Sequence, residues 1–357
     1  MNVHQFHPQV AFGDAASNQV LSLQKLLRSL GHNSEVFCEQ QPFVFEGKTH
    51  PLADYARYTS PDNVLLLHYT ILYSDNVISW LRQIPDQKVL IYHNITPHHY
   101  FAGVNAPLAE AAQRGRRQLG LLSEICDAGW GVSAFNCREL KENGWSNLGV
   151  MPIIFDPERY TVRPKRSVMD AYQDGCANVL FVGRMAPNKR VEDLILTFFY
   201  LKRYVREDAR LLLVGAHGGM GRYVGFLERV VEELDLEDVI MPGHVSHAEL
   251  MAYYRCADCY LSMSEHEGFG VPFLEAMHFG VPIVAYEAAA IPETLGDSGI
   301  LVREKAYPAI AELIGLLMED RDLRVRITRG QSTRLRDFLP ARAKERLRTL
   351  LSDVGAK

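Results

Sequence analysis

The most informative segment of the sequence is Glu265-His-Glu-Gly-Phe-Gly-Val-Pro-Phe-Leu-Glu-Ala-Met277. It follows the apolar run Cys259–Ser262, which predicts a buried strand. Pro272 suits the first turn of a following helix, where its missing N–H leaves no bond unmade. Gly268 and Gly270 let the backbone approach a ligand closely, and N–H groups at the start of a helix suit an anion such as a diphosphate. The stretch therefore predicts a ligand site between a strand and a helix.

The same stretch carries two carboxylates, Glu267 and Glu275, with seven residues between them. Glu267 lies in the expected loop and Glu275 in the first turn of the expected helix. Two carboxylates that faced an anion would repel it. They are better suited to accept hydrogen bonds from neutral hydroxyl groups, one from each side of the phosphates.

Away from this stretch, short apolar runs alternate with longer amphipathic ones, which is typical of βαβ units and of parallel sheets buried on both faces. The runs form two sets, and each set predicts a doubly wound sheet. Ligands of such sheets bind outside the carboxyl ends of the strands, so two facing halves predict a cleft. The expected strands are Val3–Phe6, Glu35–Cys38, Asn63–His68, Lys88–Tyr92, Gly129–Val132 and Val150–Ile154, then Asn178–Gly183, Arg210–Gly215, Val239–Met241, Cys259–Ser262, Pro282–Tyr286 and Gly299–Val302. The expected helices are Ser17–Leu30, Val191–Val205, Tyr223–Leu234, His247–Cys256, Val271–Phe279, Pro308–Met318, Leu323–Phe338 and Ala341–Val354.

Length and composition agree with two globular domains. The chain has 357 residues, 47% of them hydrophobic and 23% charged, and a domain averages about 150 residues. No stretch approaches the roughly 18 apolar residues that span a bilayer, and Met1–Val10 lacks a signal-peptide pattern, so we expect a cytoplasmic protein. The formal net charge of -5 argues against a nucleic-acid binder.

The Glu-x7-Glu stretch resembles the motif of retaining glycosyltransferases of the GT-B architecture, in particular family 4, the glycosyl transferases group 1. Further matches occur in the family's order, and the resemblance covers nearly the whole chain. These matches are Gly131-Val-Ser133, Val182-Gly-Arg-Met-Ala-Pro-Asn-Lys189, Leu213-Val-Gly215, Gly243-His-Val245 and Pro292-Glu293.

The resemblance implies an α/β protein of GT-B architecture: two Rossmann-like domains that face a cleft, with a C-terminal helix that crosses back to the first domain. The first domain, on the acceptor side, would comprise residues 1–158, and 159–176 would connect the domains. Residues 177–338 would bind the nucleotide-sugar, and 339–357 would form the returning helix.

The resemblance also implies roles for single residues. Arg184 and Lys189 would hold the donor's diphosphate and stabilise the charge that develops on it. Glu275 would bind the ribose hydroxyls, and Glu267 the hydroxyls of the donor sugar. Backbone groups would contribute the other donor contacts. These lie at Gly268, Phe269, Gly270 and Val271 for the phosphates and at Gly243, His244 and Val245 for the base.

Two segments of the first half resemble further family elements. Phe12-Gly-Asp-Ala-Ala-Ser-Asn18 resembles the family's glycine loop, from which only Gly13 is carried over because the commoner Gly-Gly form is absent. Tyr92-His-Asn-Ile-Thr-Pro97 ends a strand, and His93 matches the histidine that the family uses near the donor sugar. The two motifs together are typical of a bacterial subgroup in polysaccharide or lipid-linked sugar synthesis.

The expected reaction is transfer of a sugar from a nucleotide-sugar, UDP slightly favoured over GDP, to a hydroxyl of a glycan or lipid-linked saccharide. The anomeric configuration would be retained, and neither a metal nor another cofactor is expected. Two alternatives stay open. One is a GT-B enzyme of another class, such as a sugar-nucleotide epimerase or a phosphorylase, because fold does not fix function. The other is a non-catalytic nucleotide-sugar-binding partner in a biosynthetic complex.

Several smaller features have a structural and a functional interpretation. We interpret Cys256 and Cys259 as packing where a helix meets a strand, and Asp320-Arg-Asp322 as a helix start rather than a metal triplet. His98 and His99, with His93, lack the spacing of a zinc site. The basic residues Arg114, Arg116 and Arg117 form either a solvated helix face or a contact with the inner membrane surface.

Overall fold

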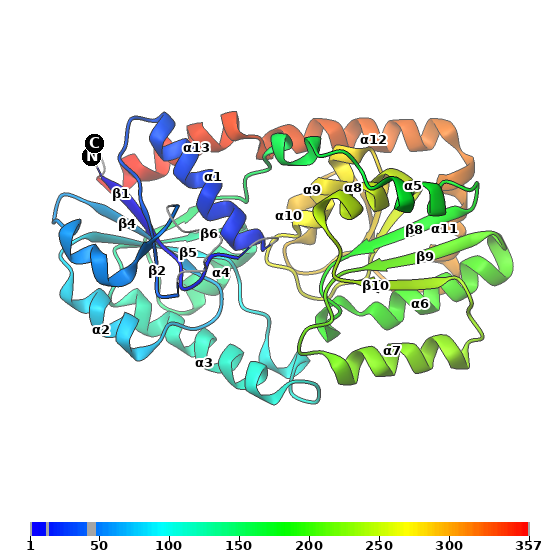
Figure 1. Ribbon diagram of the computed structural model, residues 1–357, viewed down its shortest axis with the longest axis horizontal. Coiled ribbons are helices and arrows are strands. Elements are labelled where there is room, and N and C mark those ends of the chain that lie inside the picture. The colour runs from blue at the N-terminus through cyan, green and yellow to red at the C-terminus, as the bar shows by residue number, and fades with distance from the viewer. Residues whose placement is uncertain (1, 12–13, 41–47, 356–357) are drawn as a thin grey trace. The chain divides into compact units, whose positions relative to one another are not determined.

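The chain divides into two compact units by contacts between its residues. The computed structural model describes residues 2–11, 14–40 and 48–355. The first unit comprises Met1–His98, Glu110–Asp156 and Asp337–Lys357, and the second comprises His99–Ala109 and Pro157–Arg336. Each unit is built on one parallel sheet covered by helices (Figure 1).

The first unit holds a seven-stranded parallel sheet in the order β3-β2-β1-β4-β5-β6-β7. Every residue of the central strand β4 is buried, as expected for a parallel strand with helices on both faces. Figure 1 shows α1 and α13 on one side of this sheet and α2 on the other. Its elements are β1 (Val3–Phe6), α1 (Ala15–Ser29), β2 (Val36–Cys38), β3 (His50–Pro51), η2 (Leu52–Arg57), β4 (Val64–Tyr69), α2 (Asp75–Gln83), β5 (Gln87–Tyr92), most of α3 (Ala106–Ser123), β6 (Ala128–Gly131), α4 (Ala134–Glu142), β7 (Leu148–Val150) and α13 (Pro340–Asp353).

The second unit holds a six-stranded parallel sheet in the order β10-β9-β8-β11-β12-β13. Helices α6 and α7 lie on one side of it, and α8 and α9 on the other (Figure 1). Its elements are η4 (Pro157–Thr161), α5 (Arg166–Tyr172), β8 (Ala177–Val182), η5 (Pro187–Lys189), α6 (Val191–Tyr200), η6 (Leu201–Val205), β9 (Ala209–Val214), α7 (Gly221–Glu233), β10 (Val239–Gly243), α8 (His247–Cys256), β11 (Cys259–Ser262), α9 (Val271–Phe279), β12 (Ile283–Tyr286), α10 (Ile291–Leu295), β13 (Ile300–Val302), α11 (Tyr307–Glu319) and α12 (Arg321–Leu335). Two short helices, η3 (His98–Tyr100) and η7 (Arg336–Phe338), stand where the chain passes from one unit to the other.

Each sheet has one point where the strand order reverses. In the first unit it lies between β1 and β4, and in the second between β8 and β11. Connections leave the two strands of such a pair in opposite directions, which opens a crevice at their carboxyl ends where ligands of doubly wound sheets bind. The residues that follow these four strands are therefore the first place to look for a site.

The last helix, α13, packs on the first unit, as the sequence predicted. Lys344 Nζ donates to the carbonyl of Ser29 at 2.9 Å. Leu350 lies so close to Gly149 that a Cβ at this glycine would stand 2.4 Å from Leu350 Cδ2. Gly149 is thus needed for close packing of α13 on β7.

The predicted boundaries fail in three places. The strand expected at 150–154 is Leu148–Val150, because Met151–Phe155 supplies buried side chains but no ladder. The expected connection 159–176 contains helix α5, which joins the second unit through a bond from Lys165 N to the carbonyl of Ala248 (2.9 Å). Residues 99–109, expected with the first domain, group with the second unit.

Several local predictions are confirmed. Helix α8 begins at His247 as predicted, and Ser246 and Glu249 form a capping box at its start. Asp320 caps α12 by accepting from Leu323 N at 2.8 Å, so the acidic triplet is a helix start. Cys256 ends α8 and Cys259 begins β11. None of the helices in the described part of the chain has the length and apolar composition that crossing a bilayer requires.

Candidate functional site

Two loops meet at the reversal point of the second unit's sheet. The first follows β8 and contains Arg184 and Lys189, and the second follows β11 and carries Glu267. Asn188 joins them, because its side-chain amide donates to the carbonyl of His266 (3.0 Å) and its own carbonyl accepts from Glu265 N (2.9 Å). Residues almost eighty positions apart in the chain are thus held side by side.

Lys189 and Glu267, both predicted for the site, form an ion pair. Lys189 Nζ lies 2.6 Å from Glu267 Oε1. The lysine side chain is 19% exposed and the glutamate side chain 15%, so the pair is largely removed from water. A cation and an acceptor for hydroxyl groups therefore stand in direct contact at the carboxyl edge of the sheet.

Arg184 projects from the same loop and remains exposed. Its guanidinium lies 5.8 Å from the ring centre of Phe101, close enough for a cation–π contact. Among the described residues it has no carboxylate partner within ion-pair distance. This leaves its charge available to an anion. Phe101 comes from the segment 99–109, which belongs to this unit although most of the chain around it lies in the other.

The start of α9 forms the predicted junction between a glycine-containing loop and a helix. Gly270 precedes the helix with φ of 94°, and a Cβ there would stand 2.5 Å from the ring of Phe273, so only glycine fits. Pro272 occupies the first turn. The loop is held from behind by Thr294, whose hydroxyl donates to the carbonyl of Phe269 at 2.6 Å. Val271, also predicted for the site, is the first residue of the helix.

Glu275 is buried within the unit. Its Oε1 accepts from the Tyr160 hydroxyl at 2.9 Å, and its Oε2 accepts from the Tyr254 hydroxyl at 2.6 Å. Burial raises the pKa of Glu275 above 4.5, while the two hydroxyl donors act in the opposite direction. Each carboxylate oxygen keeps one further lone pair for a ligand. The structure shows no contact between Glu275 and Glu267.

The predicted base-binding segment lies at the end of β10, two strands away from β8 in the sheet. Gly243 ends β10, and its carbonyl accepts from Gly215 N at 3.1 Å. His244 is exposed and Val245 is half-buried. The neighbouring His217 was not predicted, yet its Nε2 is buried without a partner in the described structure.

An ion network supports the site and was also missed. Lys305 Nζ lies 2.7 Å from both Asp193 Oδ2 and Glu265 Oε1. Arg190, with φ of 51°, pairs with the same two carboxylates. Tyr100 donates to Glu265 at 3.3 Å. The residues of this network are spread over more than 200 positions of the sequence, and no local sequence motif predicts them.

The first unit holds the remaining predicted residues. His93 follows β5, and its Nε2 lies 2.9 Å from Nδ1 of His68, which is near the end of β4. Burial lowers the pKa of His93 to about 3, and the neighbouring His7 contributes in the same direction. Gly13 lies outside the described residues.

The remaining candidates have structural partners. Arg116 donates to the Ile95 carbonyl (2.7 Å) and pairs with Glu139 (2.6 Å), so a membrane-facing patch would depend on Arg114 and Arg117. In the described part of the chain no three His, Cys, Asp or Glu side chains gather as a metal site would need.

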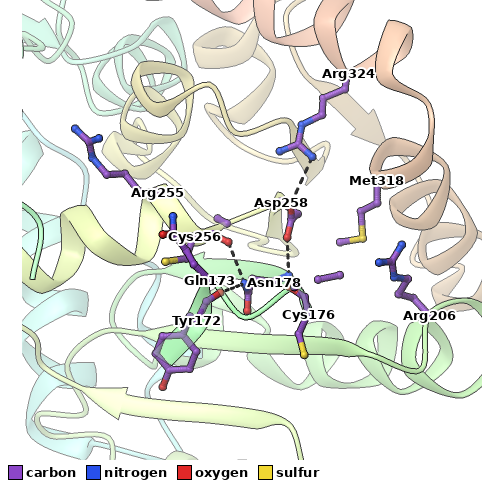
Figure 2. Close-up of a pocket in the computed structure, with 13 residues that line it drawn as sticks. Tyr172, Gln173, Cys176, Asn178, Arg206, Arg255, Cys256, Asp258, Met318 and Arg324 are labelled. Atoms are coloured by element: carbon purple, nitrogen blue, oxygen red, sulfur yellow. Dashed lines mark hydrogen bonds and ion pairs between the residues drawn. The ribbon is translucent and has the colours of Figure 1, made fainter. Parts of the chain in front are cut away.

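A cavity of about 460 Å³ lies at the opposite edge of the second unit's sheet, where β8 and β11 begin, and Figure 2 shows the residues that line it. Its polar groups bind one another. Asp258 accepts from Asn178 N at 2.9 Å and lies 3.6 Å from Arg324, and the Asn178 amide donates to the carbonyls of Tyr172 and Cys256. This is the amino edge of the strands, away from the position at which such sheets bind ligands.

Comparison with solved structures identifies the architecture. Anabaena Alr3699/HepE in complex with UDP and glucose matches with a TM-score of 0.76 at 17% identity, over 99% of both chains. Sucrose-phosphate synthase from Thermosynechococcus elongatus matches with a TM-score of 0.76 at 18% identity, over 100% of both. The chain has the GT-B fold. At these identities the likeness concerns the fold alone.

Sequence comparison adds a match that contains the site. The family model for glycosyl transferases group 1 matches residues 173–333, which include Arg184, Lys189, Glu267 and Glu275. The O-antigen chain mannosyltransferase B of Escherichia coli is 31% identical over 42% of this chain and 39% of its own. A D-inositol 3-phosphate glycosyltransferase of Corynebacterium glutamicum is 30% identical over 50% and 44%. The chain spans less than half the length of these relatives in the match. These findings show the GT-B fold and a match to the glycosyl transferases group 1 over the segment that holds the candidate site.

Proposed function

We propose that the protein is a retaining glycosyltransferase that moves a sugar from a nucleoside diphosphate sugar to a hydroxyl acceptor without a metal ion. The observation that carries this proposal is the contact between Lys189 and Glu267 at the carboxyl edge of the sheet, beside the start of α9. A cation for the diphosphate and an acceptor for sugar hydroxyls are adjacent there. The match to the glycosyl transferases group 1 supports the same assignment.

In the proposed reaction the bond between the anomeric carbon and the diphosphate oxygen breaks, and a bond to the acceptor oxygen forms. Arg184 and Lys189 stabilise the negative charge that develops on the departing diphosphate. The leaving phosphate oxygen takes the proton of the acceptor hydroxyl, so attack occurs on the face that the diphosphate leaves and the configuration is retained. The protein contributes orientation and electrostatic stabilisation.

Glu267 and Glu275 divide the donor between them in this proposal. Glu267 accepts from hydroxyls of the transferred sugar, and Glu275 accepts from the ribose with the lone pairs that Tyr160 and Tyr254 leave free. Backbone groups at Gly268, Phe269 and Gly270 contact the phosphates. Gly243, His244 and Val245 contact the base.

The names of the relatives indicate which substrates to try first. One solved neighbour contains UDP-glucose, whereas a relative from Mycobacterium tuberculosis is a GDP-mannose-dependent mannosyltransferase acting on a phosphatidylinositol monomannoside. We propose a UDP-sugar as the donor, with a GDP-sugar as the alternative, and a saccharide or lipid-linked saccharide as the acceptor. A lipid-linked acceptor would bring the protein to the cytoplasmic face of the inner membrane.

The test is a donor screen followed by analysis of the product. Thermal unfolding is measured with UDP- and GDP-sugars, because a ligand at a hundred times its dissociation constant adds about 2.7 kcal/mol of stability. Transfer or slow hydrolysis of the stabilising donor is then followed by proton NMR. The first product formed should keep the anomeric configuration of the donor. A product of inverted configuration would contradict the retaining mechanism, and stabilisation by neither class of donor would contradict the proposal as a whole.

A further inference from the structure

Three histidines gather at the carboxyl edge of the first unit's sheet, at its reversal point. His7 follows β1, His68 lies near the end of β4, and His93 follows β5. The rings of His68 and His93 stack with their centres 5.2 Å apart, and the His7 ring lies 6.1 Å from that of His68. The sequence assigned a role to His93 alone.

A buried glutamine fixes the direction of the hydrogen bonds in this cluster. The Gln5 side chain is fully buried, and its Nε2 donates to the carbonyl of Val20 in α1 at 3.1 Å. The opposite orientation of the amide would place Gln5 Oε1 against the Val20 carbonyl oxygen, and both of these atoms are acceptors. Gln5 Oε1 therefore faces His68 Nε2, at 2.9 Å, and can only accept. The proton between them belongs to His68 Nε2.

This proton decides the tautomer of the next ring. Burial lowers the pKa of His68 well below 6.5, so the ring is neutral and carries one proton, at Nε2. Its Nδ1 is then a bare acceptor, and the bond of 2.9 Å from His93 requires a proton on His93 Nε2. His93 is neutral too, so its Nδ1 carries no proton. In the described structure this Nδ1 has no protein partner.

We propose that Gln5 and His68 are positioning residues that hold His93 in the tautomer protonated at Nε2, so that His93 Nδ1 accepts a hydrogen bond from a substrate hydroxyl. An uncharged ring that presents only a lone pair suits a hydroxyl and not a phosphate. The identity of the ligand rests on the proposed function, whereas the fixed tautomer does not.

His7 adds a donor beside this acceptor. Its Nδ1 accepts from Gln9 N at 3.3 Å, which places its proton on Nε2. That Nε2 is buried and has no partner in the described structure. A hydroxyl group both donates and accepts, so a donor and an acceptor in one cluster fit a hydroxyl better than any charged group. The cluster also lies near the carboxylate of Asp14, which acts against the low pKa values of His7 and His93.

The direct test is nitrogen-15 NMR of the full chain with labelled histidine. Two-bond proton–nitrogen spectra distinguish protonated from bare ring nitrogens, and His68→Asn and His93→Gln assign the signals. We expect both rings to be protonated at Nε2 and bare at Nδ1. In Gln5→Leu, His93 should become a mixture of tautomers. In the matched control Gln24→Leu, which removes another buried amide bonded to a carbonyl of this unit, it should stay fixed. A proton on His93 Nδ1 in the native protein, or an unchanged His93 in Gln5→Leu, would overturn the proposal.

Kinetics tests the consequence once a donor is known. Gln5→Leu and His68→Leu should each lower kcat about tenfold, the lower end of the effect of removing the hydrogen-bond partner that orients a metal-bound histidine. KM for the donor should change less, and Gln24→Leu should behave as the native protein. His68→Asn, which keeps an acceptor oxygen toward His93, should recover part of the loss. An unchanged kcat in Gln5→Leu would overturn the proposed role. If no donor is turned over, the proposed function fails, and the NMR result still decides the tautomer.

Discussion

Lys189 and Glu267 form an ion pair and are also proposed to act in the reaction. A double-mutant cycle separates the contribution of the pair to stability from the roles of the two residues in the reaction. Lys189→Met removes the charge and leaves the Glu267 carboxylate, 15% exposed, without its cation. Glu267→Gln leaves the lysine without its anion. The double variant leaves neither charge unpaired.

The structure sets the expected size of the coupling. Exposed ion pairs contribute about 0.2–1 kcal/mol, and breaking a fully buried pair costs about 3–5 kcal/mol. With side chains 19% and 15% exposed and a separation of 2.6 Å, this pair lies between the two limits. We expect a coupling of about 1.5–3 kcal/mol, the range for hydrogen bonds to charged groups. In a unit of this size each kcal/mol shifts Tm by about 2–4 °C.

The assay is calorimetric unfolding of the four proteins, with donor turnover measured beside it. Each single variant should lose stability and the double variant should regain much of it, while all three turn over the donor poorly. Arg303→Met is the matched control, because Arg303 pairs with Glu287 in the same unit and its side chain is 83% exposed. The stability and the turnover of this variant should change little. Additive losses of stability would refute the account of the pair. A double variant with native turnover would refute the catalytic roles.

Four further predictions concern the same site. Arg184→Ala should lower kcat about 10²–10³-fold while leaving Tm nearly unchanged, because its charge faces no carboxylate and one preorganised donor contributes about 2.7–4 kcal/mol to the barrier; a native kcat would remove Arg184 from the mechanism. Burial raises the pKa of Glu275, so nucleotide affinity should rise with pH above 4.5 as this carboxyl group ionises. Tyr254→Phe should move the rise in affinity to higher pH, because it removes a hydrogen-bond donor to the ionised carboxylate. Calorimetric titrations in which Tyr254→Phe moves the midpoint of this rise to lower pH would contradict the prediction. For the same reason the folded protein holds this proton more tightly than the unfolded chain, and the contribution of Glu275 to stability should fall as pH rises from about 4.5 through its raised pKa. Transfer should continue in excess chelator, and loss of the rate with recovery on adding Mg²⁺ or Mn²⁺ would show that a metal is required.

The fold could be predicted well from the sequence because local patterns, the apolar runs of strands and the caps of helices, determine most of its elements. Apolar runs such as Asn63–His68 and Cys259–Ser262 appear as β4 and β11 within a residue, and helices with good caps, such as α8, begin where predicted. The short strand β3 was not predicted because two residues, His50 and Pro51, offer no periodicity. The returning segment 99–109 was assigned to its neighbours in sequence, since nothing local indicates that its contacts lie in the other unit.

Local backbone features of the candidate site could be predicted where a motif is contiguous, and its supporting contacts were missed where the fold assembles them. Pro272 lies in the first turn of α9 as predicted, and Gly270 precedes the helix with φ of 94°, because both residues act within a few positions of the chain. Lys305 reaches Glu265 from 40 positions away, and the tyrosines on Glu275 come from two other elements. Such partners are selected by burial and charge in three dimensions, which a single sequence does not display.

We propose that the carboxyl edge of the second unit's sheet binds a nucleoside diphosphate sugar, with Glu275 on the nucleotide and Glu267 on the sugar. The most direct measurement is calorimetry of UDP and GDP binding to the native protein, Glu275→Gln and Glu267→Gln, beside kinetics with the full donor. One of the two nucleotides should bind the native protein. Glu275→Gln should weaken that binding, and Glu267→Gln should spare it but lower kcat. Loss of nucleotide binding in Glu267→Gln with intact binding in Glu275→Gln would contradict the assignment, and no binding of either nucleotide to the native protein would contradict the claim itself.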